Sequence, residues 1–87
     1  MAQYKIDFTP SADKALRKLP QSVQVRIATA VKGLVNDPRP RGSLKLKSED
    51  DLWRIRVGDY RVVYTIEDDE LIVLVVRVAH RKDVYQG

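Results

Sequence analysis

The dipeptide Gly58-Asp59 constrains the fold more than any other feature of this sequence. It separates two runs rich in β-branched and aromatic residues, 52–57 and 60–66. A two-residue connection of this kind between two such runs is typical of a tight β-hairpin. Because the loop length also sets the register, Val57 should face Tyr60, and the pairs behind them should follow in order. The sequence therefore predicts an antiparallel ribbon.

The predicted register gives the ribbon one apolar and one cationic face. Arg54, Arg56 and Arg61 share the cationic face, with Arg56 directly opposite Arg61. Like charges in such positions destabilise a ribbon by up to about 1 kcal/mol. Because arginine forks match phosphate oxygens, we interpret this face as an anion-binding site. The alternative is that the arginines extend into water or pair with Asp59 and nearby acidic turns. The predicted core face holds Trp53, Ile55, Val57, Tyr60, Val62, Tyr64 and Ile66.

The N-terminal segments predict one strand followed by two helices. Apolar and polar residues alternate over 4–8, which is typical of a half-buried strand. Thr9-Pro10 has the composition of a helix start, Pro20 interrupts the helical pattern, and 36–38 ends it. We therefore expect an α+β fold, with a helical hairpin on one face of a mainly antiparallel sheet of about four strands.

The last strand is expected at Leu71–Val78. It is apolar at nearly every position, which favours a central strand covered on both sides. Arg77 is interpreted as a partly buried structural arginine near Tyr60, although a bulge would move it to the cationic face. A short extended piece could also form around 44–47, and the tail from 79 onward is short and polar.

Composition excludes several classes of protein. The chain has no cysteine, so disulfides, thiolate nucleophiles and cysteine-ligated zinc are excluded. A single histidine argues against a structural metal site. The longest apolar run, 71–76, is far shorter than the ~20 residues that span a bilayer, and no basic-then-apolar leader opens the sequence. We expect a cytoplasmic protein that needs no cofactor and no membrane.

The distribution of charge favours a polyanionic partner. Seven of the twelve acidic residues fall in 49–51 and 67–70, which leaves sixteen basic residues against five acids elsewhere. If both acidic clusters are turns, the rest of the surface is strongly positive, as in many nucleic-acid-binding proteins. Solvated lysines that maintain solubility are the alternative.

Two segments together resemble a known family. They are the run LWRIRVGDYRVVY at 52–64 and the tail HRKDVY at 80–85. In this order, on a basic chain of this size, they resemble the RelE/ParE-type toxins of prokaryotic toxin–antitoxin modules. The resemblance covers nearly the whole chain and implies a single RelE-like toxin domain over 1–87. It also implies one of two activities, because RelE members cleave messenger RNA at the ribosomal decoding site and ParE members inhibit DNA gyrase.

The tail and hairpin residues favour the RelE-like branch, the mRNA interferases. ParE-like chains tend to lack the catalytic-type arginine and the terminal tyrosine, whereas Arg61, Arg81 and Tyr85 are all present here. The resemblance implies that Arg61 steadies the phosphate, Arg81 aids the leaving group, and Tyr85 stacks on or orients a base. The hypothesis is a metal-independent endoribonuclease in which the RNA 2′-hydroxyl attacks the neighbouring phosphodiester. Arg54 and Arg56 complete the expected catalytic set, and Lys45, Lys47, His80 and Lys82 are expected to bind RNA.

The sequence also departs from the family pattern. The positions matching Arg54 and Arg56 are often lysine in characterised RelE enzymes, where one serves as general base. Arginine holds its proton too tightly for that role at pH 7. His80 is an acid–base candidate because histidine exchanges protons near neutral pH, although a lone histidine at a strand end is more often structural. With the sequence ending at Gly87, we expect no C-terminal helix of the kind that some relatives have.

The resemblance implies partners as well. The expected ones are a cognate RelB-like antitoxin, in a toxin–antitoxin hetero-oligomer, and the ribosome with its message. Two alternatives stay open: a ParE-like inhibitor that binds gyrase, and a catalytically weak member that acts as an antitoxin-bound co-repressor. The arginines at 54 and 56 are the best support for the second alternative.

Overall fold

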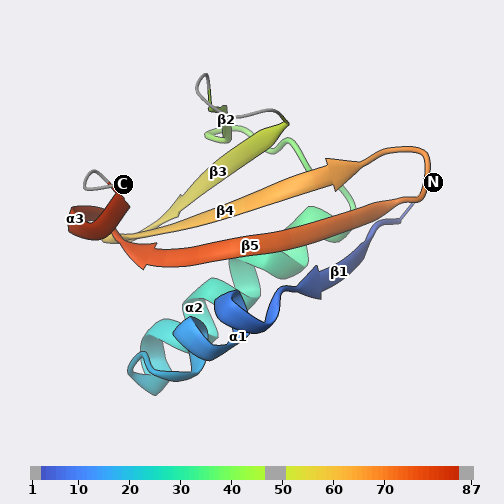
Figure 1. Cartoon of the computed structure of the whole chain (residues 1–87). Helices are drawn as coiled ribbons and strands as arrows, with labels where there is room; N and C mark the ends of the chain where they lie inside the picture. The colour runs from blue at the N-terminus through green and yellow to red at the C-terminus, as the bar shows by residue number, and fades with distance from the viewer. Residues whose placement is uncertain (1–2, 47–50, 85–87) are drawn as a thin grey trace.

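A sheet and a layer of two helices make up the fold in the computed structural model, which describes residues 3–46 and 51–84 (Figure 1). The strand order is β1-β5-β4-β3-β2, and every neighbouring pair is antiparallel except β1 with β5, which is parallel. The predicted α+β architecture is confirmed, with β2 as a short fifth strand. The elements are β1 (Lys5–Phe8), α1 (Pro10–Arg17), α2 (Gln21–Lys32), the 3₁₀ turn η1 (Gly33–Val35), β2 (Leu44–Lys45), β3 (Leu52–Val57), β4 (Tyr60–Glu67), β5 (Ile72–His80) and α3 (Arg81–Val84).

The helical hairpin forms where the proline pattern places it. Thr9 has extended backbone angles, and its Oγ1 accepts a hydrogen bond of 3.2 Å from the amide of Ala12, so it caps α1. Pro10 follows at the first helical position, where its missing amide costs nothing. Both helices lie on the same side of the sheet (Figure 1). The fully buried core between the layers includes Ala12, Ile27, Val31, Leu34, Val62, Tyr64, Val73 and Val75.

The β3–β4 hairpin has the predicted register. Val57 pairs with Tyr60, Arg56 with Arg61, and Trp53 with Tyr64. Gly58 has φ +59°, whereas Asp59 is not among the positive-φ residues, which is the pattern of a type II′ turn. The loop matches the right-handed twist of the strands, so the register is fixed from the turn outward.

A β-bulge between β4 and β5 changes the faces of the last strand. Val63 pairs with Arg77, but the next residue, Tyr64, pairs with Val75, so Val76 is the extra residue. The prediction that Arg77 lies near Tyr60 on the core side is therefore wrong. The bulge places Arg77 on the same face as Val63, where it is exposed.

The C-terminal part departs from the sequence-based expectation in two further ways. β5 has a strand on each edge but is covered on one face only: Val73 and Val75 are fully buried, whereas Leu74 is half-buried. Residues 81–84 then form the short helix α3, where we expected a polar tail without a helix. None of the helices in the described ranges has the length and apolar character needed to cross a membrane.

Candidate functional site

Four arginines from three adjacent strands lie on the face of the sheet opposite the helices. Arg54 and Arg56 come from β3, Arg61 from β4 and Arg77 from β5. The pairing places Arg56 opposite Arg61, while Val63 lies between Arg54 and Arg77. Directly paired residues share a face, so all four side chains leave the same side of the sheet. We call these four residues the arginine face.

Arg61 is the buried member of this face. Its side chain is buried, with 4% of the residue exposed, and its Nε has no hydrogen-bond partner among the residues that the structure describes. Nη1 donates a long bond of 3.4 Å to the carbonyl oxygen of Tyr60. Burying a guanidinium with an unused donor is costly, because lost hydration is not replaced. The sequence predicted the face on which Arg61 lies but not its burial.

Within the described residues, no carboxylate neutralises Arg54, Arg56 or Arg61. The ion pairs found there join Arg17 to Asp13 and Arg39 to Asp68, both away from the arginine face. The alternative that these three arginines pair with Asp59 or the acidic turns is therefore wrong for the residues that the structure describes. The face keeps positive charge available for an anion.

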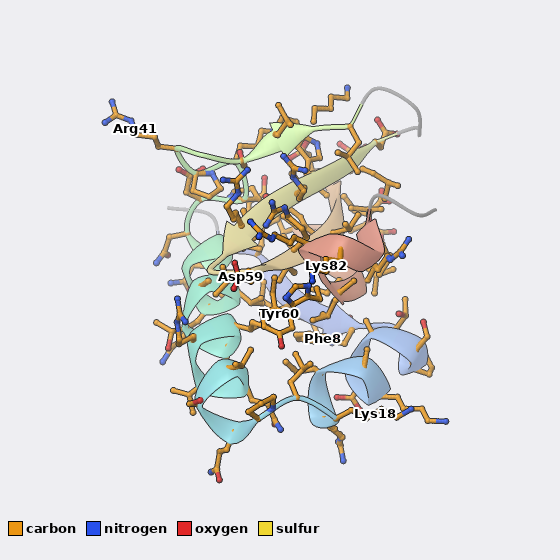
Figure 2. The ribbon with its side chains drawn as sticks, turned by 90° about the vertical axis from the view of Figure 1, so that its left-hand side faces the viewer. Phe8, Lys18, Arg41, Asp59, Tyr60 and Lys82 are labelled. Carbon is orange, nitrogen blue, oxygen red and sulfur yellow. The ribbon has the colours of Figure 1, made fainter. Side chains whose placement is uncertain are left out.

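A hollow of about 310 Å³ opens beside β3. It is lined by Arg54, Ile55 and Arg56 and by Arg41 and Gly42 of the preceding loop. Figure 2 shows the Arg41 side chain projecting away from the body of the protein. The hollow therefore has two strand arginines in its wall and lies next to the arginine pair at positions 56 and 61, where a phosphate group can enter.

The tail residues assemble at the end of the sheet nearest the hairpin turn. The Arg81 amide donates to the carbonyl oxygen of Asp59 at 2.7 Å, which ties α3 to the turn. Figure 2 shows Lys82 beside Asp59 and Tyr60. Arg61 pairs with Ala79, two residues before Arg81, so Arg81 begins α3 close to the buried arginine. The side chains of Arg81 and Lys82 are exposed, and Tyr85 lies outside the described residues.

Two other predicted RNA-binding residues do not join the arginine face. Lys45 pairs with Trp53, so it lies on the opposite face of the sheet, at the edge strand β2. The His80 ring is half-buried and contacts the Tyr60 ring edge to face, with a centroid distance of 5.3 Å. Lys47 falls outside the described residues.

A cluster that sequence reasoning missed holds the loop before β2. Arg39 donates to both carboxylate oxygens of Asp68, at 3.3 and 2.9 Å, and the Tyr4 hydroxyl donates to the same carboxylate at 2.7 Å. The Arg39 guanidinium also lies 5.2 Å from the centroid of the Trp53 ring. The hydrogen bonds from Arg39 and Tyr4 lower the pKa of Asp68. These residues lie far apart in the sequence, so no local pattern indicates the cluster.

The same loop is fixed from inside the core. The hydroxyl of Tyr64 donates a hydrogen bond of 2.7 Å to the carbonyl oxygen of Pro38. Tyr64 is fully buried, and this burial raises its pKa to about 12. Because Tyr64 and the Arg39 cluster hold the loop on both sides, the segment that reaches the hollow starts from a fixed position.

Comparisons with known proteins find similarity to toxins of toxin–antitoxin systems. The family model for the ParE toxin of the type II toxin–antitoxin system parDE matches residues 6–85. Toxin RelG of Mycobacterium tuberculosis is 31% identical over 84 residues, covering 95% of this chain and 97% of that protein. The mRNA interferase toxin RelE of Escherichia coli is 30% identical over 81 residues, covering 91% and 84%.

Solved structures with the same fold include toxin–antitoxin complexes. The archaeal RelE–RelB complex from Pyrococcus horikoshii superposes with a TM-score of 0.80 at 28% identity, covering 91% of this chain and 96% of that one. A toxin–antitoxin complex from Mycobacterium tuberculosis gives 0.82 at 30% identity, covering 92% and 100%.

Proposed function

We propose that this chain, which belongs to the RelE-like toxins of type II toxin–antitoxin systems, is an endoribonuclease that cuts messenger RNA on the ribosome. The observation that carries the proposal is Arg61, a buried cation with an unused donor, directly opposite Arg56. Two guanidinium groups face each other here, and no carboxylate of the described residues forms an ion pair with either of them. Such an arrangement is suited to binding a phosphate. The name mRNA interferase on a relative at 30% identity supports the same activity.

The proposed reaction is a transesterification within the RNA chain. The 2′-oxygen forms a bond to the adjacent phosphorus, and the bond from phosphorus to the 5′-oxygen of the next nucleotide breaks. The products are a 2′,3′-cyclic phosphate and a free 5′-hydroxyl. Negative charge grows on the phosphoryl oxygens in the transition state, and Arg61, Arg56 and Arg54 stabilise it. Fixed charges of this kind act most strongly where water is excluded, as around Arg61.

Arg81 is proposed to act at the leaving group. It begins α3 next to the hairpin turn, so its exposed guanidinium can reach the 5′-oxygen as the bond breaks. The 2′-hydroxyl proton passes to water, because guanidinium groups retain their protons at pH 7. The departing 5′-oxygen takes a proton from water to become the 5′-hydroxyl, while the positive charge of Arg81 stabilises the negative charge that develops on that oxygen. The step invokes no metal, since the arginines supply the positive charge. Without a side-chain base, the enzyme depends on the ribosome to align the substrate.

The partners follow from the charge of the same face. Relatives of this fold occur in complexes with RelB antitoxins, and we propose that a RelB-like antitoxin covers the arginine face here. An acidic segment that folds on binding is the matching chemistry. On the ribosome, Lys82 is proposed to contact the RNA backbone and Tyr85 a base. Binding should weaken steeply as salt rises.

A translation extract with a reporter message tests this function. Arg61→Ala and Arg81→Ala should abolish codon-specific cuts in the message, whereas Arg17→Ala, on the far surface of α1, should cut like the wild type. Circular dichroism of each variant checks that the fold is intact. If the Arg61→Ala and Arg81→Ala variants both cut the message normally, the roles proposed for these two residues are wrong.

A second candidate function is inhibition of DNA gyrase, because the matching family model carries the name ParE toxin. This candidate predicts loss of supercoiling by purified gyrase, intact messages, and little effect of Arg61→Ala. A supercoiling assay with the same three variants separates the two functions directly.

A further inference from the structure

We infer that His80 is a positioning residue, which caps the start of α3 and thereby sets where Arg81 stands relative to Arg61. The inference rests on the proposed function for what Arg81 does, but the capping contact itself stands on the geometry alone. His80 is the last residue of β5, and Arg81 is the first residue of α3. The position before the first helical residue is the N-cap, which has extended backbone geometry, as a strand residue does.

Two successive amides at the start of α3 have hydrogen-bond partners outside the helix. The Arg81 amide donates to the carbonyl oxygen of Asp59 at 2.7 Å, and the Lys82 amide donates to Nδ1 of His80 at 3.3 Å. The first amides of a helix have no partner within it, so each needs an acceptor from elsewhere. His80 therefore acts as the N-cap of α3: its Nδ1 accepts a hydrogen bond from a backbone amide, as the side-chain oxygen of serine or aspartate does at other helix starts.

Tyr60 holds the His80 ring in the orientation that this contact needs. The two residues are paired across β4 and β5, and their rings meet edge to face at 5.3 Å and 85°. With Nδ1 accepting from Lys82, the neutral ring carries its proton on Nε2. His80 therefore bridges the sheet and α3 through two different contacts.

The position of Arg81 depends on this bridge. A helix of four residues has almost no stability of its own, so contacts at its start decide where it points. Arg61 pairs with Ala79, and only His80 separates that residue from Arg81. If the Lys82 bond is lost, the Asp59 bond is the one hydrogen bond found between the start of α3 and the described part of the sheet, and α3 can change its orientation about it. The guanidinium of Arg81 is then displaced from the position at which it contacts the 5′-oxygen. Because this contact acts on the leaving group, the maximal rate falls more than substrate affinity does.

Three substitutions separate capping from the other roles that histidine can have. His80→Ala removes both the acceptor and the ring. His80→Asn restores a capping acceptor without the ring, and His80→Phe keeps a ring against Tyr60 without an acceptor. A cap worth about 1 kcal/mol corresponds to a fivefold change, so Ala and Phe should lower the maximal cutting rate about fivefold. Asn should bring it back to within about twofold of the wild type.

The matched control is Thr9→Ala, which removes the equivalent cap of α1 far from the arginine face. It should lower the melting temperature and leave the rate per folded molecule unchanged. The second readout is the Lys82 amide resonance in a ¹⁵N-labelled sample, which needs no ribosome. The resonance should move to a random-coil position in the Ala and Phe variants and stay near the wild-type position in Asn.

The remaining outcomes overturn the inference. An active Phe variant with an inactive Asn variant would mean that His80 acts through ring packing. If the His80→Phe and His80→Asn variants are both inactive, and the Lys82 amide resonance in His80→Asn is native, then His80 itself transfers a proton. A wild-type rate in the Ala variant would mean that the cap does not matter. If wild-type protein cut no message, the proposed function would fail, and the Lys82 resonance would still decide whether His80 caps α3.

Discussion

Replacing the buried arginine by methionine should make this protein more stable while it stops cutting RNA. Arg61 is 4% exposed, its Nε has no hydrogen-bond partner within the described ranges, and its neighbour on the adjacent strand is the cation Arg56. Methionine has a similar length and fits irregular space in a core without a charge to hydrate. Arg61→Met therefore removes an unfavourable burial from the folded state.

The size of the effect follows from three contributions. The unsatisfied buried donor costs about 1–3 kcal/mol, and the facing Arg56 adds up to about 1 kcal/mol. Loss of the 3.4 Å bond from Arg61 to the Tyr60 carbonyl subtracts little, because the bond is long. We expect a net gain of about 2 kcal/mol, within the range of about 1–4 kcal/mol found when apolar residues replace buried charges. For a domain of this size, that gain corresponds to a rise in melting temperature of about 8–16 °C.

Urea unfolding followed by circular dichroism measures this change, at one pH and one salt concentration. The midpoint should rise without a change in slope, because the surface exposed on unfolding stays nearly the same. Arg17→Met is the matched control, and as an exposed position it should shift stability by no more than about 0.5 kcal/mol. If Arg61→Met is no more stable than the wild type, the guanidinium is satisfied in the folded protein. In that case Arg61 has no unused donor to offer a phosphate.

Three further predictions follow from other parts of the fold. Between pH 10 and 12 the unfolded phenol of Tyr64 releases its proton while most of the folded phenol, with a pKa of about 12, keeps it, so stability should fall by about 2 kcal/mol. Tyr64→Phe should remove that part of the pH dependence in a urea titration series. Gly58→Ala should cost about 1–2 kcal/mol in thermal unfolding, because φ is +59° and the added Cβ would lie 3.0 Å from Nη2 of Arg26. Adding Arg26→Ala to the Gly58→Ala variant should recover only a small part of the lost stability, since the backbone strain at position 58 remains. Arg56→Lys should raise the cutting rate in a translation extract, because lysine can release a proton to act as a base; a slower variant would contradict the view that the missing base limits the wild type.

The ribbon that carries the arginine face could be predicted from the sequence because its register depends on local chemistry. A two-residue loop at Gly58-Asp59 leaves one arrangement of the strands behind it, and the observed pairs follow it from Val57 to Trp53. The start of α1 was predictable for the same reason, since Thr9 and the following proline act within one turn.

The features that were missed depend on contacts between distant segments. The face of Arg77 is set by a bulge, and β5 has too little alternation to show where it falls. The burial of Arg61 runs against the usual exposure of arginine, so composition gives no sign of it. The contact of Arg39 with Asp68 spans 29 positions, and a four-residue helix such as α3 has no periodicity to detect.

The parallel pairing of β1 with β5 has a consequence for how the chain folds during synthesis. Among the described strands, β1 is made before the others, yet its partner in the sheet, β5, is made after them, with Lys5 alongside Ile72 and Phe8 alongside Val75. Long-range pairing of this kind forms late and slowly. The buried layer around Val73 and Val75 cannot close over the helices before that moment. A nascent chain therefore cannot complete this sheet until β5 has been translated.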